Sequence, residues 1–384
     1  MRVIIAFLPA LLAVATGCAE DRCDPSLWRE VTPTVQAHES FGVAVLESGH
    51  VLVVGGHALG DGGRSDSRYI DDVEIYDPMN DRWRATTSLP EVLEGISQLV
   101  VLPDRRVMLV GETTRNATRA RVDLYDPVSE SWSQTGSLVV ARDGSWPTRL
   151  GDDRVLAAGG IDYYAPGRPV HASAEVYDPA TETWSLVGAM SVPRVGHRTA
   201  RLADGSVLVV GGTDIEDSDH HLALLERFDP TTLAFHASGE LHVARSQHAV
   251  ATLTGGRVLV AGGAVGAYGH HTSLRKAELY DPGTETTVEV GDMLEARASF
   301  TLLPLADGRA LAVGGVVRQD GNRALASAEV FDPETGVWSS AGCMHVARWQ
   351  HSTVALADDS ILAIGGFNNG TGQLRSVERL DHVP

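Results

Sequence analysis

The chain repeats one short pattern, an apolar run of four residues that ends in a pair of glycines. The copy from Val51 to Gly56 reads VLVVGG, and the copy from Val207 to Gly212 is identical to it. Such a run, apolar without alternation, indicates a short strand buried on both faces. In the copy at Gly111, Glu112 replaces the second glycine. The first glycines recur about every 51 residues, a period typical of solenoids and propellers; they stand at 55, 111, 159, 211, 262, 314 and 365.

A second signature follows the first six copies: an aromatic residue and then Asp-Pro, as in Tyr177-Asp178-Pro179. Proline suits the second position of a type I turn. Loops such as Ala203-Asp204-Gly205-Ser206 supply the glycine that a tight hairpin favours. One repeat is therefore expected to form four strands: inner strand a, apolar strand b, strand c before the Asp-Pro turn, and outer strand d. A tryptophan follows the aspartate in four copies, at Trp83, Trp132, Trp184 and Trp338.

From about Cys23 to Asp381 the chain resembles kelch repeats, on these two signatures. The resemblance implies an all-β, seven-bladed kelch β-propeller with four-stranded blades. The seventh copy ends after its strand c, whereas Cys23 to Trp28 looks like a shortened Asp-Pro turn with its tryptophan. We therefore expect the N-terminal strand to close the last blade, which leaves no open sheet edge. A single propeller is expected over 19–384, with repeats at about 38–90, 91–138, 139–190, 191–240, 241–292, 293–342, and 343–384 plus 23–33.

Residues 1–18 are typical of an export signal. Arg2 precedes an apolar run from Val3 to Ala15, which is too short to span a bilayer and indicates a cleavable signal peptide. Ala15-Thr16-Gly17-Cys18 resembles a lipobox, although the family pattern prefers leucine where Ala15 stands. We expect lipidation at Cys18 and a place in the cell envelope, at the outer membrane or cell surface, with cleavage near Ala15 and a secreted or periplasmic protein as the alternative.

The charge of the chain argues against nucleic acid as a partner. The formal net charge is −19, and Lys276 is the single lysine, whereas phosphate-binding proteins need clustered positive charge. A membrane is expected to be contacted through the lipid anchor only. Cys23 and Cys343 could pair in an oxidising compartment, but the expected strand order places them at opposite ends of their blades. We therefore expect no disulfide.

The long, variable connections of the predicted blades share one face, the natural place for binding residues. A recurring arginine begins the repeats on this face, with His38 and Glu94 at its place in the first two blades. One interpretation is an anion-binding ring at the channel mouth, since guanidinium groups suit carboxylates. The other is that arginine ties adjacent blades together through backbone carbonyls. The candidate ligand-binding residues are Arg142, Arg194, Arg245, Arg297, Arg348 and His38.

The sequence offers no convincing catalytic or metal site, and no cofactor is expected. His197, His248 and His351 follow an arginine by three residues, and we expect them to be structural hydrogen-bonding groups. The loop histidines match no known ligand spacing. Galactose oxidase-like copper enzymes share this repeat, but they need a cysteine crosslinked to a tyrosine, and no tyrosine lies near Cys343 in the sequence.

Three functions remain compatible with the sequence. The leading hypothesis is a non-catalytic binding or scaffold module outside the cytoplasm, which binds a protein or glycan through the long-loop face. The alternatives are a carbohydrate-active enzyme at the channel mouth, similar to sialic acid mutarotase, and a structural envelope component. The enzyme would require an acid or base there with a perturbed pKa.

Overall fold

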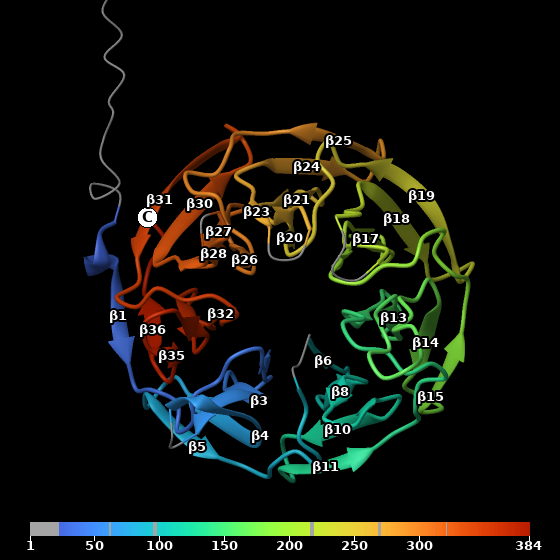
Figure 1. The fold of residues 1–384 in the computed structure, drawn as a ribbon, viewed down its shortest axis with the longest axis horizontal. Coiled ribbons are helices and arrows are strands. Elements are labelled where there is room, and N and C mark those ends of the chain that lie inside the picture. Colours follow the sequence, from blue (N-terminus) through green and yellow to red (C-terminus); the bar gives the residue numbers. More distant parts are fainter. Residues whose placement is uncertain (1–22, 61–62, 95–97, 216–218, 268–269, 320) are drawn as a thin grey trace, which may run out of the picture.

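The computed structural model describes residues 23–384 apart from 61–62, 95–97, 216–218, 268–269 and 320. Seven four-stranded antiparallel sheets stand in a ring around a central axis (Figure 1). The prediction of an all-β, seven-bladed propeller is confirmed. No helix in the described ranges is long and apolar enough to cross a membrane.

The blades follow one another along the chain, and each runs from an inner strand a to an outer strand d. Blade 1 consists of β2 (Gly42–Val45), β3 (Val51–Gly60), β4 (Gly63–Asp77) and β5 (Arg82–Ala85). Blade 2 consists of β6 (Leu99–Val101), β7 (Val107–Val110), β10 (Val122–Asp126) and β11 (Ser131–Gln134). Blade 3 consists of β12 (Thr148–Arg149), β13 (Val155–Ala158), β14 (Ala174–Asp178) and β15 (Thr183–Leu186).

The remaining blades repeat this order. Blade 4 consists of β16 (Arg198–Arg201), β17 (Val207–Val210), β18 (Leu224–Asp229) and β19 (Ala234–Glu240). Blade 5 consists of β20 (Ala249–Thr252), β21 (Val258–Ala261), β24 (Ala277–Asp281) and β25 (Thr286–Glu289). Blade 6 consists of β26 (Thr301–Pro304), β27 (Ala310–Val313), β30 (Ser327–Asp332) and β31 (Val337–Cys343). Blade 7 is β32 (Ser352–Ala355), β33 (Ile361–Ile364), β36 (Val377–Leu380) and β1 (Trp28–Val31).

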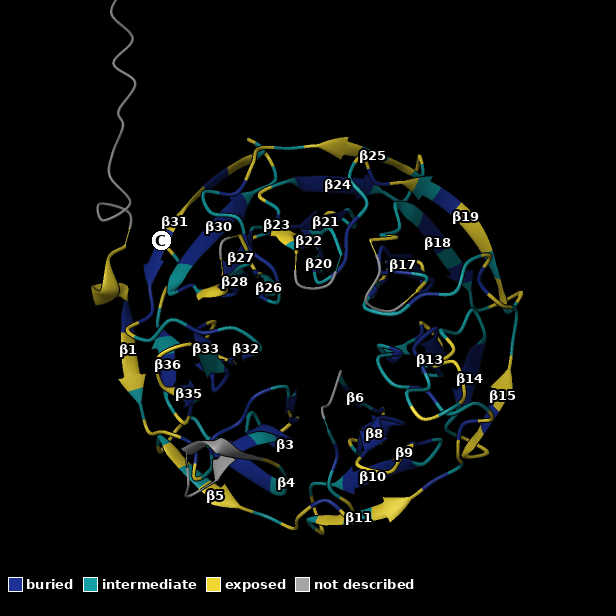
Figure 2. Cartoon of the chain, viewed as in Figure 1, coloured by how far each residue is buried: buried dark blue, intermediate teal, exposed yellow. Residues whose placement is uncertain are grey.

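Apolar side chains between neighbouring blades form the core. Every residue of the strand b runs, such as β17, is buried, as their unbroken apolar character predicts. The clusters cross from blade to blade: Val54 of blade 1 packs with Leu109 and Tyr125 of blade 2. The outer strands are mostly exposed (Figure 2). Each sheet is therefore stabilised chiefly by the blades on either side of it.

The last blade is closed by the N-terminal strand, as predicted. β1 pairs antiparallel with β36, and Trp28 stands opposite Leu380. The Trp28 side chain is 1% exposed, and its indole N–H donates to the carbonyl of Ala341 in blade 6 at 3.3 Å. This strand joins the two ends of the described chain, so the ring has no free edge between its first and last blades.

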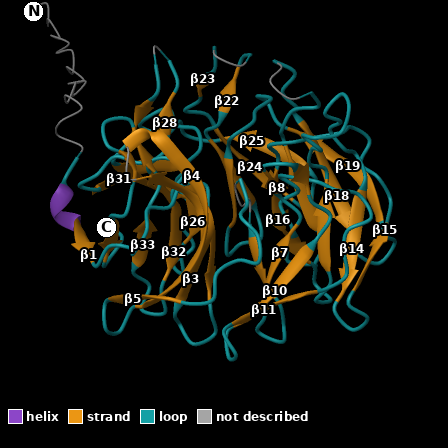
Figure 3. Ribbon diagram, turned by 60° about the horizontal axis from the view of Figure 1, so that its bottom comes forward, coloured by secondary structure: helices purple, strands orange, loops and turns teal. Residues whose placement is uncertain are grey.

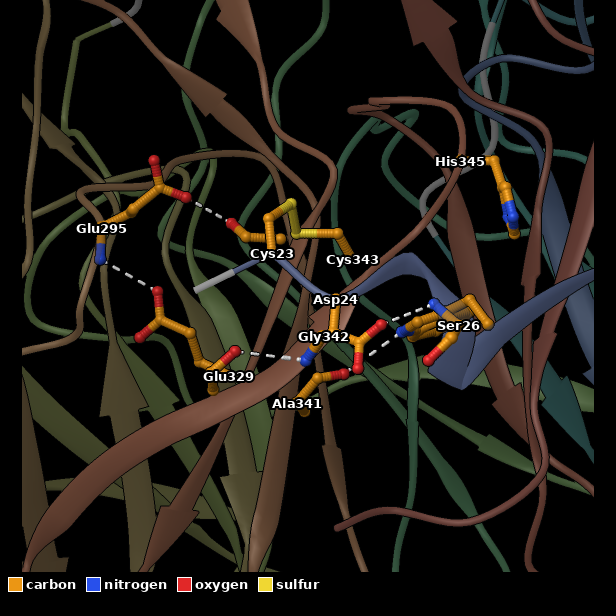
Figure 4. The surroundings of a disulfide bond; sticks show 12 residues. Cys23, Asp24, Ser26, Glu295, Glu329, Ala341, Gly342, Cys343 and His345 are labelled. Atoms are coloured by element: carbon orange, nitrogen blue, oxygen red, sulfur yellow. Dashed lines mark hydrogen bonds between the residues drawn. A yellow bond between two sulfur atoms is a disulfide. The ribbon is translucent and has the colours of Figure 1, made fainter. Parts of the chain in front are cut away.

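Cys23 and Cys343 form a disulfide, and the expectation that they would not pair was wrong (Figure 4). Their Cα atoms lie 5.0 Å apart, a distance usual for disulfides. β31 continues past the length of most strands d to Cys343, with a register shift, and so reaches the segment that precedes β1. There the Cys343 N–H donates to the carbonyl of Asp24 at 3.1 Å. Sequence spacing alone did not reveal this extension.

The two faces of the ring differ in their connections. One face carries the short a–b and c–d turns. The other carries the long b–c loops, in which four small hairpins form (Figure 3). These hairpins are β8–β9 (Thr113–Thr114, Ala117–Thr118), β22–β23 (Ala264–Val265, Thr272–Ser273), β28–β29 (Val316–Val317, Arg323–Ala324) and β34–β35 (Phe367–Asn368, Gly372–Gln373).

Candidate functional site

The five recurring arginines lie inside the blades, with no exposed surface. In blade 3, Arg142 Nη1 donates to the carbonyl of Gly159 at 2.7 Å, and its Nη2 donates to Glu175 Oε1 at 2.9 Å. The same Glu175 carboxylate accepts the N–H groups of Val139 and Val140, which hold the d–a connection in place. The equivalent pairs are Arg194–Glu226, Arg245–Glu278, Arg297–Glu329 and Arg348–Glu378.

This burial corrects the hypothesis of an anion-binding ring. Each guanidinium already faces a carboxylate and the carbonyl that ends strand b of its own blade, so a ligand would have to displace both. Burial lowers the pKa of Arg142 and Arg348, and the paired glutamates oppose that shift. Neighbouring blades are connected by backbone groups and not by these guanidinium groups: the carbonyl of Arg194 accepts the N–H of Gly160 in the preceding blade at 2.9 Å.

In blades 1 and 2, other residues replace the arginine that contacts the buried acid of the blade. His38 is buried at the arginine position, with Nδ1 2.8 Å from the carbonyl of Gly55 and Nε2 3.1 Å from Glu74 Oε1. In blade 2 the position belongs to the buried Leu93, and Arg119 reaches Asp123 from the b–c loop at 2.7 Å instead. The prediction that placed Glu94 at the arginine position of blade 2 was therefore wrong by one residue.

His197, His248 and His351 are buried, and each ring packs against a glycine of the preceding blade. A Cβ added to Gly211 would lie 2.7 Å from His248 Cε1, so the glycine makes room for the ring. In the equivalent contact of another blade, Phe300 takes the place of histidine beside Gly262. Burial lowers the pKa of His197 and His351 to about 3, so both rings are neutral. The expected hydrogen-bonding role holds for His351, whose Nε2 lies 3.3 Å from the Thr301 hydroxyl, whereas packing accounts for the burial of His197 and His248.

Carboxylates of three successive blades gather at the channel mouth on the long-loop face. Glu94 and Asp143 occupy the same repeat position, because the N–H of Glu94 donates to the carbonyl of Thr113 and that of Asp143 to the carbonyl of Ile161. Glu39 holds this position in blade 1, where burial raises its pKa. Blades 4 to 7 have uncharged residues there: Val195, Ser246, Ala298 and Trp349.

Glu94 and Asp143 border a cavity of about 760 Å³, which we call the mouth pocket. Burial, with Glu94 nearby, raises the pKa of Asp143, although hydrogen bonds to Thr113 and Glu112 oppose the shift. Two carboxyl groups can share a hydrogen bond only if one of them holds a proton. The lining residues are Ser40, Tyr69, Glu94, Glu112, Thr113, Asp143, Tyr163, Tyr164, Arg168 and Gln350.

Glu112 is in a backbone conformation that side chains rarely adopt. Its φ is +77°, and its side chain is 2% exposed. At the equivalent Gly160, an added Cβ would lie 2.5 Å from the carbonyl of Asp143. A glutamate in a left-handed conformation costs about 1–2 kcal/mol, and such strain often marks a functional site. The replacement of a repeated glycine by Glu112 was the sequence signal that could have located the mouth pocket.

The pocket is therefore suited to cations or to acid–base chemistry. Its carboxylates attract ammonium and guanidinium groups, and the Asp143–Glu112 pair could hold a proton. In the ranges that the structure describes, no group of three or more His, Cys, Asp or Glu residues is arranged to hold a metal ion. His220, a loop histidine, lies 3.8 Å from Asp214. Cys18, the predicted lipidation site, lies outside the described residues.

Comparison with known sequences identifies kelch motifs and kelch-like relatives. The Kelch motif matches residues 48–90, 150–191 and 305–345. Human Kelch-like protein 34 is 26% identical over 81% of this chain and 48% of its own length. Human Kelch-like protein 33 is 32% identical over 34% of this chain and 23% of its own length. The chain thus spans at most about half of these relatives.

Solved structures of other proteins share the fold. A fungal alcohol oxidase of the AA5 family, in complex with copper, superposes with a TM-score of 0.72 at 17% identity, over 92% of this chain and 75% of that one. YjhT superposes with a TM-score of 0.61 at 14% identity, over 81% and 99%. At these identities the likeness concerns the fold alone. Cys343, the candidate for the cysteine–tyrosine crosslink of the copper enzymes, is bonded to Cys23 here.

Proposed function

Since the chain is a kelch-repeat β-propeller, we propose that it is a non-catalytic binding module whose long-loop face takes a protein partner, with a lysine or arginine side chain of the partner in the mouth pocket. The observation that carries this proposal is the convergence of Glu94, Glu112 and Asp143 on one cavity of about 760 Å³. An amino sugar of a glycan could present a similar cation, and the test below separates the two sources.

The electrostatics of the pocket favour a cation over the acidic ligands that a ring of arginines would suit. Arg168 is the one cation among the described lining residues, and its guanidinium lies 4.9 Å from the centre of the Tyr163 ring. Burial and the Glu94 carboxylate raise the pKa of Tyr69. Opposite Glu94 and Asp143, a partner's cation would relieve the repulsion between acids that now border one cavity.

We predict that Glu112→Gly abolishes cation binding without harming the fold. Glycine is the residue of the other six repeats at this position and tolerates the positive φ. The free energy of unfolding should stay the same or rise by up to about 1 kcal/mol. Calorimetry in about 150 mM salt, which screens distant surface charges, would compare N-acetyl-Gly-Arg-Gly-amide with its citrulline analogue. We expect the arginine peptide to bind at least tenfold more tightly than the analogue, and the variant to lose the difference.

The matched control is Glu334→Gln, which removes one exposed acid from a c–d turn on the opposite face. It should leave the preference for arginine unchanged. Binding should weaken as the pH falls through the raised pKa of Asp143, because protonation removes a carboxylate from the pocket. If both variants lost the preference for the arginine peptide equally, the overall negative charge of the protein, and not the mouth pocket, would explain the binding. Tighter binding of chitobiose than of the arginine peptide would favour a glycan amine.

The second candidate function is a carbohydrate-active enzyme. It is favoured by the Asp143–Glu112 carboxyl pair, since a raised pKa is what a general acid needs. Conversion of a sugar by the native protein, lost in Glu112→Gly, would establish this function. A native protein that binds glycans and leaves them unchanged would remove it.

We also propose that the chain is exported and anchored through Cys18. The support is the apolar run before Ala15-Thr16-Gly17-Cys18 and the Cys23–Cys343 disulfide, a bond typical of oxidising compartments. In a bacterial host, Cys18→Ser should abolish labelling by a fatty acid and move the protein out of the membrane fraction, whereas Cys23→Ser should keep both. Unchanged labelling in Cys18→Ser would contradict the proposal.

A further inference from the structure

The central channel holds a second cavity of about 610 Å³, which adjoins the mouth pocket through Ser40 and Gln350. We call it the channel cavity. Its wall carries hydroxyl and amide groups from several blades, including Thr199, Ser299 and Thr353. It differs from the mouth pocket in charge, because no carboxylate is among its described lining residues.

Arg198 supplies the positive charge of the channel cavity. Its Nη1 donates to the carbonyl of His197 at 3.0 Å, and no described carboxylate lies within ion-pair distance of its guanidinium. His351, which also lines the cavity, is neutral because burial lowers its pKa to about 3. Burial lowers the pKa of Arg198 to about 10, so the side chain stays charged at neutral pH. A partly buried cation without a counter-charge favours an anion beside it.

Trp146 holds the guanidinium in a fixed place. The Arg198 Cζ atom lies 3.7 Å from the centre of the indole ring, a close cation–π contact. Trp146 itself has a φ of +44°, a conformation that is a marked outlier for a bulky residue. Its carbonyl accepts hydrogen bonds from the hydroxyls of Thr148 and Thr199. Strain at a residue that orients a charged group is typical of ligand sites.

We propose that the channel cavity binds the carboxylate of a small monoanionic ligand, with Arg198 as the recognising group. A planar carboxylate fits the free edge of a guanidinium, where two parallel N–H groups can donate. One arginine balances one negative charge, whereas a phosphate dianion would leave a surplus charge below the acidic mouth. This inference concerns a different cavity from the proposed function and does not depend on it.

The test compares carboxylates with their uncharged amides by calorimetry on the whole protein. The probes are N-acetylglycine and N-acetylglycinamide, benzoate and benzamide, and inorganic phosphate. We expect at least one carboxylate to bind tenfold or more tightly than its amide, and phosphate to bind more weakly than that carboxylate. If no carboxylate bound more tightly than its amide, the proposal would be wrong. If phosphate bound as tightly as the best carboxylate or more tightly, the assignment to a monoanion would be wrong.

Two variants assign the effect to Arg198. Arg198→Gln should reduce the preference for the carboxylate to within twofold. Arg198→Lys, which keeps the charge but not the two-pronged edge, should retain only a few-fold preference and serves if the glutamine variant does not fold. The control is Arg201→Gln, an exposed arginine on the same strand, β16. A full preference in either Arg198 variant would overturn the proposal.

Discussion

Replacing Arg245 with alanine should lower the free energy of unfolding by about 3–5 kcal/mol, because the buried Glu278 carboxylate would lose its guanidinium partner. It would keep only the N–H groups of His242 and Val243 and the half-exposed His242 ring. The side chains of Arg245 and Glu278 are fully buried, and they meet at 2.5 Å. The arginine also donates to the carbonyls of Gly262 and Lys276; both would lose this donor, and only the Lys276 carbonyl would keep another, the N–H of Gly262. Denaturant unfolding followed by tryptophan fluorescence would measure the change.

The control for this experiment is Arg84→Ala on the outer strand of blade 1. Arg84 also pairs with a glutamate, Glu130, but its side chain is 54% exposed and that of Glu130 is 36% exposed. Exposed pairs contribute about 0–1 kcal/mol. A loss below about 1 kcal/mol in Arg245→Ala would show that these arginines are not structural, and would reopen their role in binding. We expect binding of the arginine peptide to be unchanged in Arg245→Ala wherever the protein is folded.

Loss of the disulfide should be the second large effect, lowering the free energy of unfolding by about 2–5 kcal/mol. The bond joins residues separated by 320 positions, and a longer loop gives a greater restriction of the unfolded chain. It also connects the segment before β1, the closing strand of blade 7, to the end of blade 6. Cys343→Ser and dithiothreitol treatment of the native protein should lower the denaturation midpoint to a similar extent.

A double-cysteine variant separates the bond from the side chains. Cys23→Ser with Cys343→Ser should be about as stable as either single variant, because each single change already breaks the bond. Reductant should then have no effect on the variants. If the native protein has the same midpoint with and without reductant, the hydrogen-bonded pairing of β1 with β36 is by itself sufficient to hold the ring closed.

The candidate sites lie where a blade departs from the repeat. Glu112 replaces a glycine. Trp146 has a positive φ, whereas the residues at the equivalent position of most other blades do not. Each departure costs local stability, yet each places a side chain at the channel. The buried arginines and their glutamates, which obey the repeat, belong to the scaffold. In this propeller regularity accompanies structure, and irregularity accompanies the proposed functions.

Part of the arginine result was readable in the sequence. An acid stands two residues before the aromatic residue of each Asp-Pro step, as in Glu175 before Tyr177 and Glu278 before Tyr280. Its recurrence with the same period as the arginines could have indicated a buried pair within each blade. Without these acids, an arginine in the sequence suggests an exposed side chain, because charged residues are rarely buried unless they are paired.

The sequence by itself determined the number of blades, the buried strand of each blade and the closure by Trp28, because these features depend on local patterns that recur along the chain. Only the tertiary structure decided which charges are exposed. Glu94, Glu112 and Asp143 come together because neighbouring blades bring their connections to one mouth. Cys23 meets Cys343 only because β31 extends past the usual strand length. Burial and meeting at the axis depend on the register and length of every strand in the ring, and a local pattern does not specify them.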